Sequence, residues 1–222
     1  MSNRFPTVPL GRVIRHRSEF IGIDDVEVYK RCRVQLHAQG IVQRDIVQGV
    51  EIKTKKQQVC KPGEFLVAEI DAKVGGFGIV PQDLDGAIVS SHYFLFTMDD
   101  TVLDLRFLDF FIRTPASREQ VQAQGSTNYA AIRPTDVLGY QIPFPPLEEQ
   151  RRIVARIEEL ATKIVEARGL RREAVEEAEA ITHTYARKLL STVNAKTSKR
   201  HLGESWCEEK GCPSFLHEHE KT

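Results

Sequence analysis

The hydrophobic residues of the C-terminal part of the chain follow a seven-residue repeat. After position 147 a set of eleven positions follows alternating spacings of four and three residues, and nine of the eleven are apolar or aromatic. We call these positions the seam: Ile153, Ile157, Leu160, Ile164, Ala167, Arg171, Ala174, Ala178, Ile181, Tyr185 and Lys188. This spacing is typical of a coiled coil, in which the stripe of one helix packs against another helix.

The start of this helix is marked in the sequence. Pro145 and Pro146 hold the chain extended, and Glu148 and Glu149 follow in the first turn, where carboxylates suit the positive end of the helix dipole. At 1.5 Å per residue the helix would be roughly 65 Å long, which exceeds the width of a domain of this size. The sequence therefore predicts a dimerising helix over 147–191. A helix packed along its own domain is the alternative.

The first 146 residues mix strand-like and helical segments. Strand-like runs fall at 26–36, 65–70 and 87–97, and 42–52 fits a helix and a strand equally well. Residues 103–113 read as an amphipathic helix with four residues on its buried side: Leu105, Leu108, Phe111 and Ile112. We therefore expect an α+β fold, with a globular domain over 1–146 followed by the long coiled-coil helix. Residues 192–222 are polar and aperiodic and are expected to be a disordered tail.

Composition limits the functional classes. Hydrophobic residues make up 41% of the chain, which supports a packed core, but no apolar run approaches the length of a membrane span and no signal peptide is visible. We expect a cytoplasmic protein, and four scattered cysteines fit a reducing compartment. Near the C-terminus the spacing of two cysteines and two histidines is not that of a zinc finger, so no metal site is expected: Cys207, Cys212, His217 and His219.

The distribution of charge says more than the net charge of zero. Residues 1–62 hold twelve Lys or Arg and six Asp or Glu, whereas residues 63–146 hold five and eleven. A basic half within a neutral protein fits a local phosphate-binding face and predicts modest affinity for DNA without partners. Three lysines of a predicted loop are candidates for phosphate contacts: Lys53, Lys55 and Lys56. The alternative is that they are solvated and have no such role.

Two further segments bear on recognition. The segment 126–133 combines amide, hydroxyl, aromatic and cationic side chains, the types that read base edges and hold phosphates. We single out four of its residues as DNA-contacting: Thr127, Asn128, Tyr129 and Arg133. A plain surface loop is the alternative. Glycines 75, 76 and 78 lack the helix that follows a nucleotide-binding glycine loop, and we expect them to let the backbone approach a partner, such as a DNA groove.

Catalytic alternatives find little support. Asp71 and Lys73, expected at a strand end, have the acidic-x-Lys spacing of a metal-dependent nuclease, but this triplet occurs three times in the chain. His92 reads as a core or loop histidine. A methyltransferase would need a glycine-rich cofactor loop and an Asn/Asp-Pro-Pro-aromatic motif, and residues 143–146 have the wrong order. The sequence favours a non-catalytic protein.

The junction IPFPPLEEQRRIVARIEEL, at 142–160, resembles the specificity subunits of type I restriction-modification systems. Residues 67–96 and 125–150 also resemble the body of the target-recognition domains of that family, and the likeness covers roughly residues 5–190. The resemblance implies binding to double-stranded DNA, with Lys73 as a contact residue. It also implies a methyltransferase partner that carries S-adenosylmethionine, a restriction subunit attached through it, and no cofactor on this chain.

A full specificity subunit of that family carries two recognition domains and two helices, whereas this chain has one of each. The chain therefore resembles half a subunit, which would pair with itself or with another half through the seam. Antiparallel helices would then separate two recognition domains by a fixed distance, and a homodimer would read a symmetric, interrupted site. A coiled-coil protein-interaction module is the alternative from another class. A truncated gene product is a third possibility.

Overall fold

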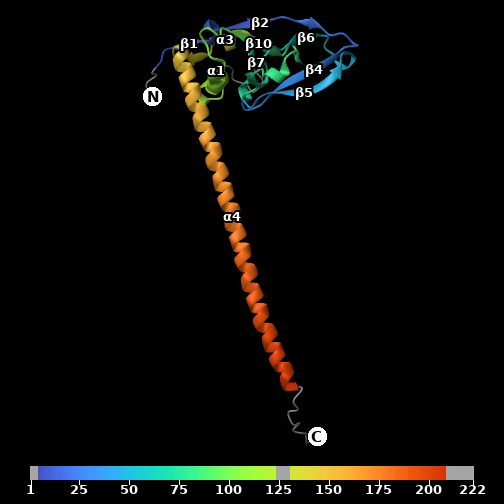
Figure 1. The fold of residues 1–222 in the computed structure, drawn as a ribbon. Helices are drawn as coiled ribbons and strands as arrows, with labels where there is room; N and C mark the ends of the chain where they lie inside the picture. The colour runs from blue at the N-terminus through green and yellow to red at the C-terminus, as the bar shows by residue number, and fades with distance from the viewer. Residues whose placement is uncertain (1–4, 124–130, 209–222) are drawn as a thin grey trace, which may run out of the picture. The chain divides into compact units, whose positions relative to one another are not determined.

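The computed structural model describes residues 5–123 and 131–208, with side chains described through 121 in the first range and through 193 in the second. The chain forms two compact units, Met1–Glu159 and Leu160–Thr222. The first unit is a domain of mixed sheets and helices, and the second consists, where described, of the continuation of one helix. The predicted α+β fold with a long C-terminal helix is confirmed (Figure 1).

The elements are short except for the last helix. The strands are β1 (Thr7–Pro9), β2 (Ile14–Arg17), β3 (Ile21–Gly22), β4 (Val28–Gln35), β5 (Gly40–Gln48), β6 (Lys56–Val59), β7 (Phe65–Ala68), β8 (Phe77–Ile79), β9 (Ile88–Val89), β10 (Tyr93–Met98) and β11 (Gln141–Pro143). The α-helices are α1 (Leu105–Ile112), α2 (Pro115–Ala123), α3 (Pro134–Gly139) and α4 (Leu147–Glu208). Single turns of 3-10 helix are η1 (Leu10–Arg12), η2 (Gly49–Glu51), η3 (Asp71–Val74) and η4 (Gln82–Leu84).

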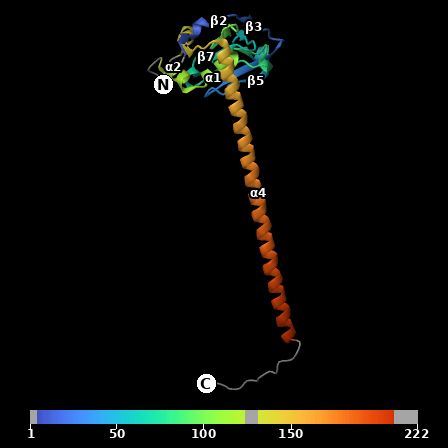
Figure 2. The ribbon, with the colours of Figure 1, turned by 60° about the vertical axis from the view of Figure 1, so that its left-hand side comes forward.

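Two sheets form the body of the domain. One has the strand order β2-β10-β7-β8 and the other β3-β6-β9-β4-β5. The long β4–β5 hairpin is the outer part of the second sheet and is visible in both ribbon views (Figures 1 and 2). A separate pair, β1 with β11, brings the start of the domain beside the segment that leads into α4. The strands therefore bring residues from distant parts of the sequence to the same surfaces.

Several local predictions need correction. The segment 42–52 is a strand followed by η2, and the run 87–97 is two strands separated at Ser90–His92. On α1 the predicted buried face is partly wrong: Leu105 is 37% exposed, whereas Phe107, which was not predicted, is buried. The hydrophobic period was right, but the face that it buries is set by the strands beneath the helix. Asp71 and Lys73 lie in η3 and not at a strand end, because β7 already ends at Ala68.

The glycine-rich segment approaches backbone of the same chain. A Cβ atom on Gly75 would lie 2.7 Å from the backbone nitrogen of Ala38, and one on Gly78 would lie 3.1 Å from Cα of Gly40. The turn of the β4–β5 hairpin docks there through hydrogen bonds from the N–H groups of His37 and Ala38 to the carbonyls of Val74 and Gly75. The predicted close approach of backbone is confirmed for this hairpin turn, whereas an approach to a DNA groove stays a prediction.

A buried glutamine fixes the first turns of α4 to the domain. Gln150 is 0% exposed, and its Oε1 accepts a hydrogen bond of 2.8 Å from the backbone N–H of Asp104. Its Nε2 donates to the carbonyls of Val102 and Pro145, each at 2.9 Å. Asp104 is in turn the N-cap of α1 and accepts hydrogen bonds from the N–H groups of two residues of its first turn. One side chain therefore joins the starts of two helices to the proline segment between domain and helix.

The predicted helix is confirmed over the whole seam, but its predicted end at residue 191 is wrong. α4 continues to Glu208, because residues 189–208 contain no proline and their one glycine is Gly203. A stripe of apolar seam residues is open to solvent, with Ile164 52% and Ile181 57% exposed. Residues 209–222 of the predicted tail lie outside the described residues. None of the described helices has the length and apolarity needed to cross a bilayer.

Loss of the Gln150 side chain should weaken the domain. We expect Gln150→Ala to lower the free energy of unfolding by about 2–4 kcal/mol, because two carbonyls and one N–H would lose their partner in a buried site. The matched control is Gln43→Ala, since Gln43 is exposed on β5 and its loss should change stability by less than about 0.5 kcal/mol. Urea unfolding followed by circular dichroism measures both. Equal midpoints for the two variants would contradict this role of Gln150.

Candidate nucleic-acid interface

A polar recess lies where the five-stranded sheet meets the start of β10. It has a volume of about 330 Å³, and we call it the notch. Its walls come from β4, β5, the segment from η2 to β6, β9 and β10. The lining residues are Arg31, Cys32, Arg44, Glu51, Ile52, Lys53, Thr54, Gln57, Ile88, Val89, Ser90 and Tyr93. Three of these side chains are cationic and one is a carboxylate, so the lining favours an anion.

A β-bulge shapes the cationic side of the notch. In the β4–β5 ladder Arg31 is opposite Asp45, but the next residue, Cys32, is opposite Gln43. Arg44 is therefore an extra residue on β5, without a partner in the ladder. A bulge bends its strand and re-aims side chains that regular alternation would place on opposite faces. This explains why Arg44 lines the same recess as Arg31, although Arg44 is next in sequence to Asp45, the ladder partner of Arg31.

The cationic side chains of the notch differ in their hydrogen-bond and ion-pair partners. Arg31 donates from Nε and Nη2 to the two carboxylate oxygens of Asp45, both at 2.6 Å. This hydrogen bonding raises the pKa of Arg31 and lowers that of Asp45. Arg44 lies at the edge of the pair, 3.5 Å from Asp45, with 57% of its side chain exposed. Within the described part of the chain Lys53 makes no hydrogen bond or ion pair, whereas Arg44 shares the carboxylate of Asp45 with Arg31. Lys53 and the exposed guanidinium of Arg44 therefore face a ligand.

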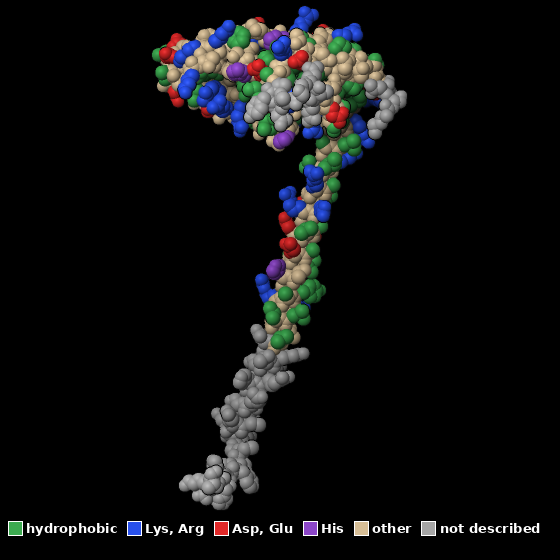
Figure 3. Space-filling view, turned by 180° about the vertical axis from the view of Figure 1, so that it is seen from behind, with side chains coloured by type: hydrophobic (Ala, Val, Ile, Leu, Met, Phe, Trp, Pro, Cys, Tyr) green, Lys and Arg blue, Asp and Glu red, His purple; other side chains and the backbone are tan. Residues whose placement is uncertain are grey.

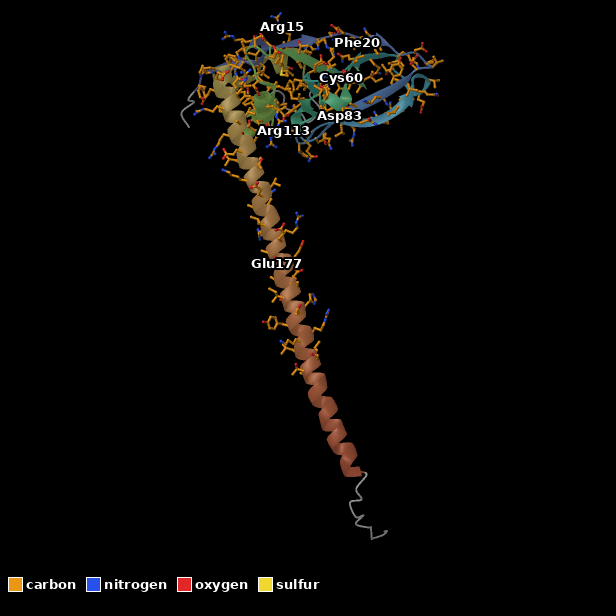
Figure 4. The ribbon with its side chains drawn as sticks, in the orientation of Figure 1. Arg15, Phe20, Cys60, Asp83, Arg113 and Glu177 are labelled. Atoms are coloured by element: carbon orange, nitrogen blue, oxygen red, sulfur yellow. The ribbon has the colours of Figure 1, made fainter. Side chains whose placement is uncertain are left out.

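The other two predicted lysines are engaged by the domain itself. Lys55 makes an ion pair with Asp25 and donates a hydrogen bond of 2.7 Å to the carbonyl of Gly49. Lys56 lies on β6, not in a loop, and its Nζ is 4.5 Å from the centre of the Phe20 ring, a residue labelled in Figure 4. Neither lysine lines the notch. The three lysines look equivalent in the sequence, but only Lys53 faces this recess.

Much of the basic excess of residues 1–62 is also used internally. Arg17 is nearly buried and donates to both carboxylate oxygens of Glu64, at 2.5 Å and 2.8 Å, and to the carbonyl of Val59. Lys30 donates to the carbonyl of Asp83. Lys and Arg side chains nevertheless remain gathered, with some carboxylates, over the end of the domain that β4, β5 and β6 form (Figure 3). The cationic surface is therefore narrower than the charge count suggests.

The turn between β9 and β10 connects the notch to the predicted recognition segment. Ser90 and Tyr93 line the notch, and His92 in the same turn pairs through Nδ1 with Glu69, at 2.7 Å. The backbone carbonyl of Glu69 accepts a hydrogen bond of 3.1 Å from the N–H of Ile132. Thr127, Asn128 and Tyr129 lie outside the described residues, whereas Arg133 is exposed at the N-cap of α3. Ile132, near the C-terminal end of the segment 126–133, is thus hydrogen-bonded to Glu69, which pairs with His92 in the turn beside the notch.

Lys73 is not among the residues that line the notch. It lies in η3, and the carboxylate of Asp71 in that turn acts on the hydroxyl of Tyr93. The pKa of Tyr93 is raised, first by burial and then by the charge of Asp71, while Arg44 and Arg33 oppose the rise. η3 and the notch therefore share an electrostatic environment. The described residues contain no group of three or more His, Cys, Asp or Glu that could hold a metal ion, and no side chain of the predicted C-terminal cysteine and histidine set is described.

Sequence reasoning missed Arg44, Tyr93 and Gln150. Gln150 is the last residue of the quoted junction motif, but only the fold reveals its three hydrogen-bond partners. Two adjacent charged residues, Arg44 and Asp45, interrupt the strand-like run from 40 to 48 and were a usable signal for the bulge. Nothing in the sequence around Tyr93 separated it from a core aromatic residue.

Comparisons with known proteins give a matching family model and similar solved structures. A family model described as type I restriction modification DNA specificity domain matches residues 24–176. The HsdS subunit from Thermoanaerobacter tengcongensis is similar in structure, with a TM-score of 0.65 and 27% identity over 80% of this chain and 47% of that one.

A second chain comes from a structure that addresses complex assembly and conformational transition of the type I R-M system, with a TM-score of 0.61 and 27% identity over 83% of this chain and 49% of that one. The chain thus spans about half the length of these solved relatives. A comparison with curated proteins gives no match. Because the family model spans more than half of the chain, from the β3–β4 connection into α4, the chain belongs to the family of type I restriction modification DNA specificity domains.

Proposed function

We propose that this chain is a DNA-recognition subunit of a type I restriction-modification complex, which binds a short sequence and brings a methyltransferase subunit to it. The observation that carries the proposal is the family match over 24–176, which includes both the notch and the first part of α4. The cationic lining of the notch supports it, since contacts from Arg and Lys to phosphates provide most of the affinity of DNA-binding proteins.

The proposed role is non-catalytic. The chemistry of DNA methylation would belong to the partner methyltransferase, which would also bind S-adenosylmethionine, and cleavage would belong to a restriction subunit recruited through the complex. This chain would position the complex on the DNA and select the DNA sequence. The modest number of available cations fits a subunit whose affinity for DNA is shared with its partner.

The half-length likeness suggests how a symmetric complex would form. An exposed apolar stripe runs along α4, and two such stripes buried against each other would remove that surface from water. Alanines at 167, 174 and 178 would let two helices approach closely. In an antiparallel pair each end of the helix bundle would carry one recognition domain, so a homodimer would read two inverted half-sites. Arg171 on the seam favours an arrangement in which it reaches a carboxylate of the partner helix or solvent.

The first test is DNA binding with and without the methyltransferase subunit. We expect the copurified pair to bind a mixed-sequence duplex pool, and the affinity to fall by about tenfold or more between 50 and 200 mM salt, because bound phosphates release counterions. Fluorescence anisotropy measures this, with the methyltransferase alone as the control. If the pair binds no more DNA than the methyltransferase alone, the chain is better explained as a coiled-coil protein-interaction module.

The second test concerns the seam. Ile164→Asp with Ile181→Asp should halve the mass of a wild-type dimer of 25.2 kDa chains, because charges would be buried between the helices. Val165→Asp with Leu190→Asp is the matched control, since both residues are exposed apolar residues of α4 outside the seam. Light scattering measures the mass. A monomeric wild-type chain, or equal effects of the two variants, would contradict self-pairing through the seam.

A further inference from the structure

We propose that the notch binds a single phosphodiester group of the DNA backbone, held between Arg44 and Lys53, and that it reads no base. This inference rests on the proposed function and adds a division of labour within the domain. The notch would fix the position of the domain on the duplex, and sequence choice would come from other side chains. Arg44 would be a phosphate contact because of the β-bulge that aims it there.

The shape of the notch separates the two roles. The base edges of a duplex lie at the bottom of a groove, about 8.5 Å deep in the major groove, so they are read by side chains that project from a protein surface. The phosphates are the groups that project from the duplex. A recess of about 330 Å³ therefore fits a phosphate with parts of its flanking sugars better than it fits a base edge.

Arg44 and Lys53 would contact this phosphate, and Arg44 also makes an ion pair of 3.5 Å with Asp45. The guanidinium of Arg31 is satisfied by both oxygens of Asp45. Glu51, the carboxylate of the lining, accepts a hydrogen bond of 3.1 Å from the backbone N–H of Gln48, which helps to hold it in the η2 turn. Arg44 is 57% exposed, and Lys53 makes no hydrogen bond or ion pair within the described residues. Arg44 comes from β5 and Lys53 from the segment between η2 and β6, and both line one recess, as a clamp on one anion requires.

Neutral donors complete the site. Thr54, Ser90 and Tyr93 also line the notch, and in the described part of the chain the hydroxyl of none of them donates a hydrogen bond to another residue. Hydroxyl groups of Ser, Thr and Tyr are, with Arg and Lys, the usual donors to phosphate oxygens. The notch therefore offers both the positive charge and the unused hydroxyl donors that a phosphodiester needs, with Tyr93 half-buried in its lining.

The test compares charge-removing variants that leave the fold intact. Arg44→Gln with Lys53→Gln removes the two clamping cations, and Lys61→Gln is the control, because Lys61 is an exposed lysine of the same domain outside the notch. Equal thermal midpoints would show that the variants fold. Affinity for duplex DNA is measured with the methyltransferase subunit present, over a series of salt concentrations, for the preferred sequence and for a scrambled one.

The clamp predicts the loss of one phosphate contact. The double variant should reduce the slope of log affinity against log salt by about 0.9, and at 0.1 M salt it should weaken binding by about eightfold. The loss should be the same for preferred and scrambled DNA, since a phosphate carries no sequence information. Lys61→Gln should leave the slope unchanged.

Two results would overturn the inference while leaving the proposed function intact. One is wild-type DNA binding that the double variant weakens no more than Lys61→Gln does, which would place the contact elsewhere. The other is an unchanged salt slope with altered preference between the two sequences, which would mean that Arg44 and Lys53 read bases. If the wild-type pair binds no DNA beyond the methyltransferase alone, the proposed function and this inference both fail.

Discussion

The side chain of Gln150 is the polar contact on which the junction of domain and helix depends. A fully buried amide is costly unless its hydrogen bonds are made, and here three partners satisfy it: the N–H of Asp104 and the carbonyls of Val102 and Pro145. These partners belong to the α1 N-terminus and to the proline segment. The first turns of α4 are therefore part of the domain, and Val154 is buried in the same core.

The position of the notch depends on close packing of backbone at the tip of the β4–β5 hairpin. The turn of the β4–β5 hairpin docks on Gly75, and Arg113, labelled in Figure 4, donates a hydrogen bond of 2.9 Å to the carbonyl of Ala38 in that turn. The hairpin is thus held at its tip by the segment before β8 and by α1. With the tip fixed, the bulge at Arg44 is fixed in register, and so is the position of the cation that lines the notch. The glycines thus position the hairpin that carries Arg44.

The sequence could predict what depends on long periodic patterns. The start of α4, its seam and its helical state follow from spacing alone, and the α+β class follows from the mixture of short segments. The end of α4 could not be read from the seam, because the helix continues on local propensity after the apolar repeat stops.

The site was harder to predict because it depends on register. The bulge that aims Arg44 exists only when β4 is paired with β5, and Lys55 and Lys56 find partners in Asp25 and Phe20, about thirty residues earlier in the chain. A lysine-rich run therefore shows that cations are present, but it does not show which of them lack a partner within the domain. Arg133 is exposed as expected, while Thr127, Asn128 and Tyr129 stay predictions.

We propose that one recognition domain and one seam together make a symmetric reader of DNA. The most direct measurement is selection of duplexes from a random-sequence pool by the chain with its methyltransferase, followed by sequencing of the retained DNA. The account predicts two copies of one short sequence in inverted orientation, separated by a constant gap. Enrichment of a single half-site, or no enrichment over the starting pool, would contradict it.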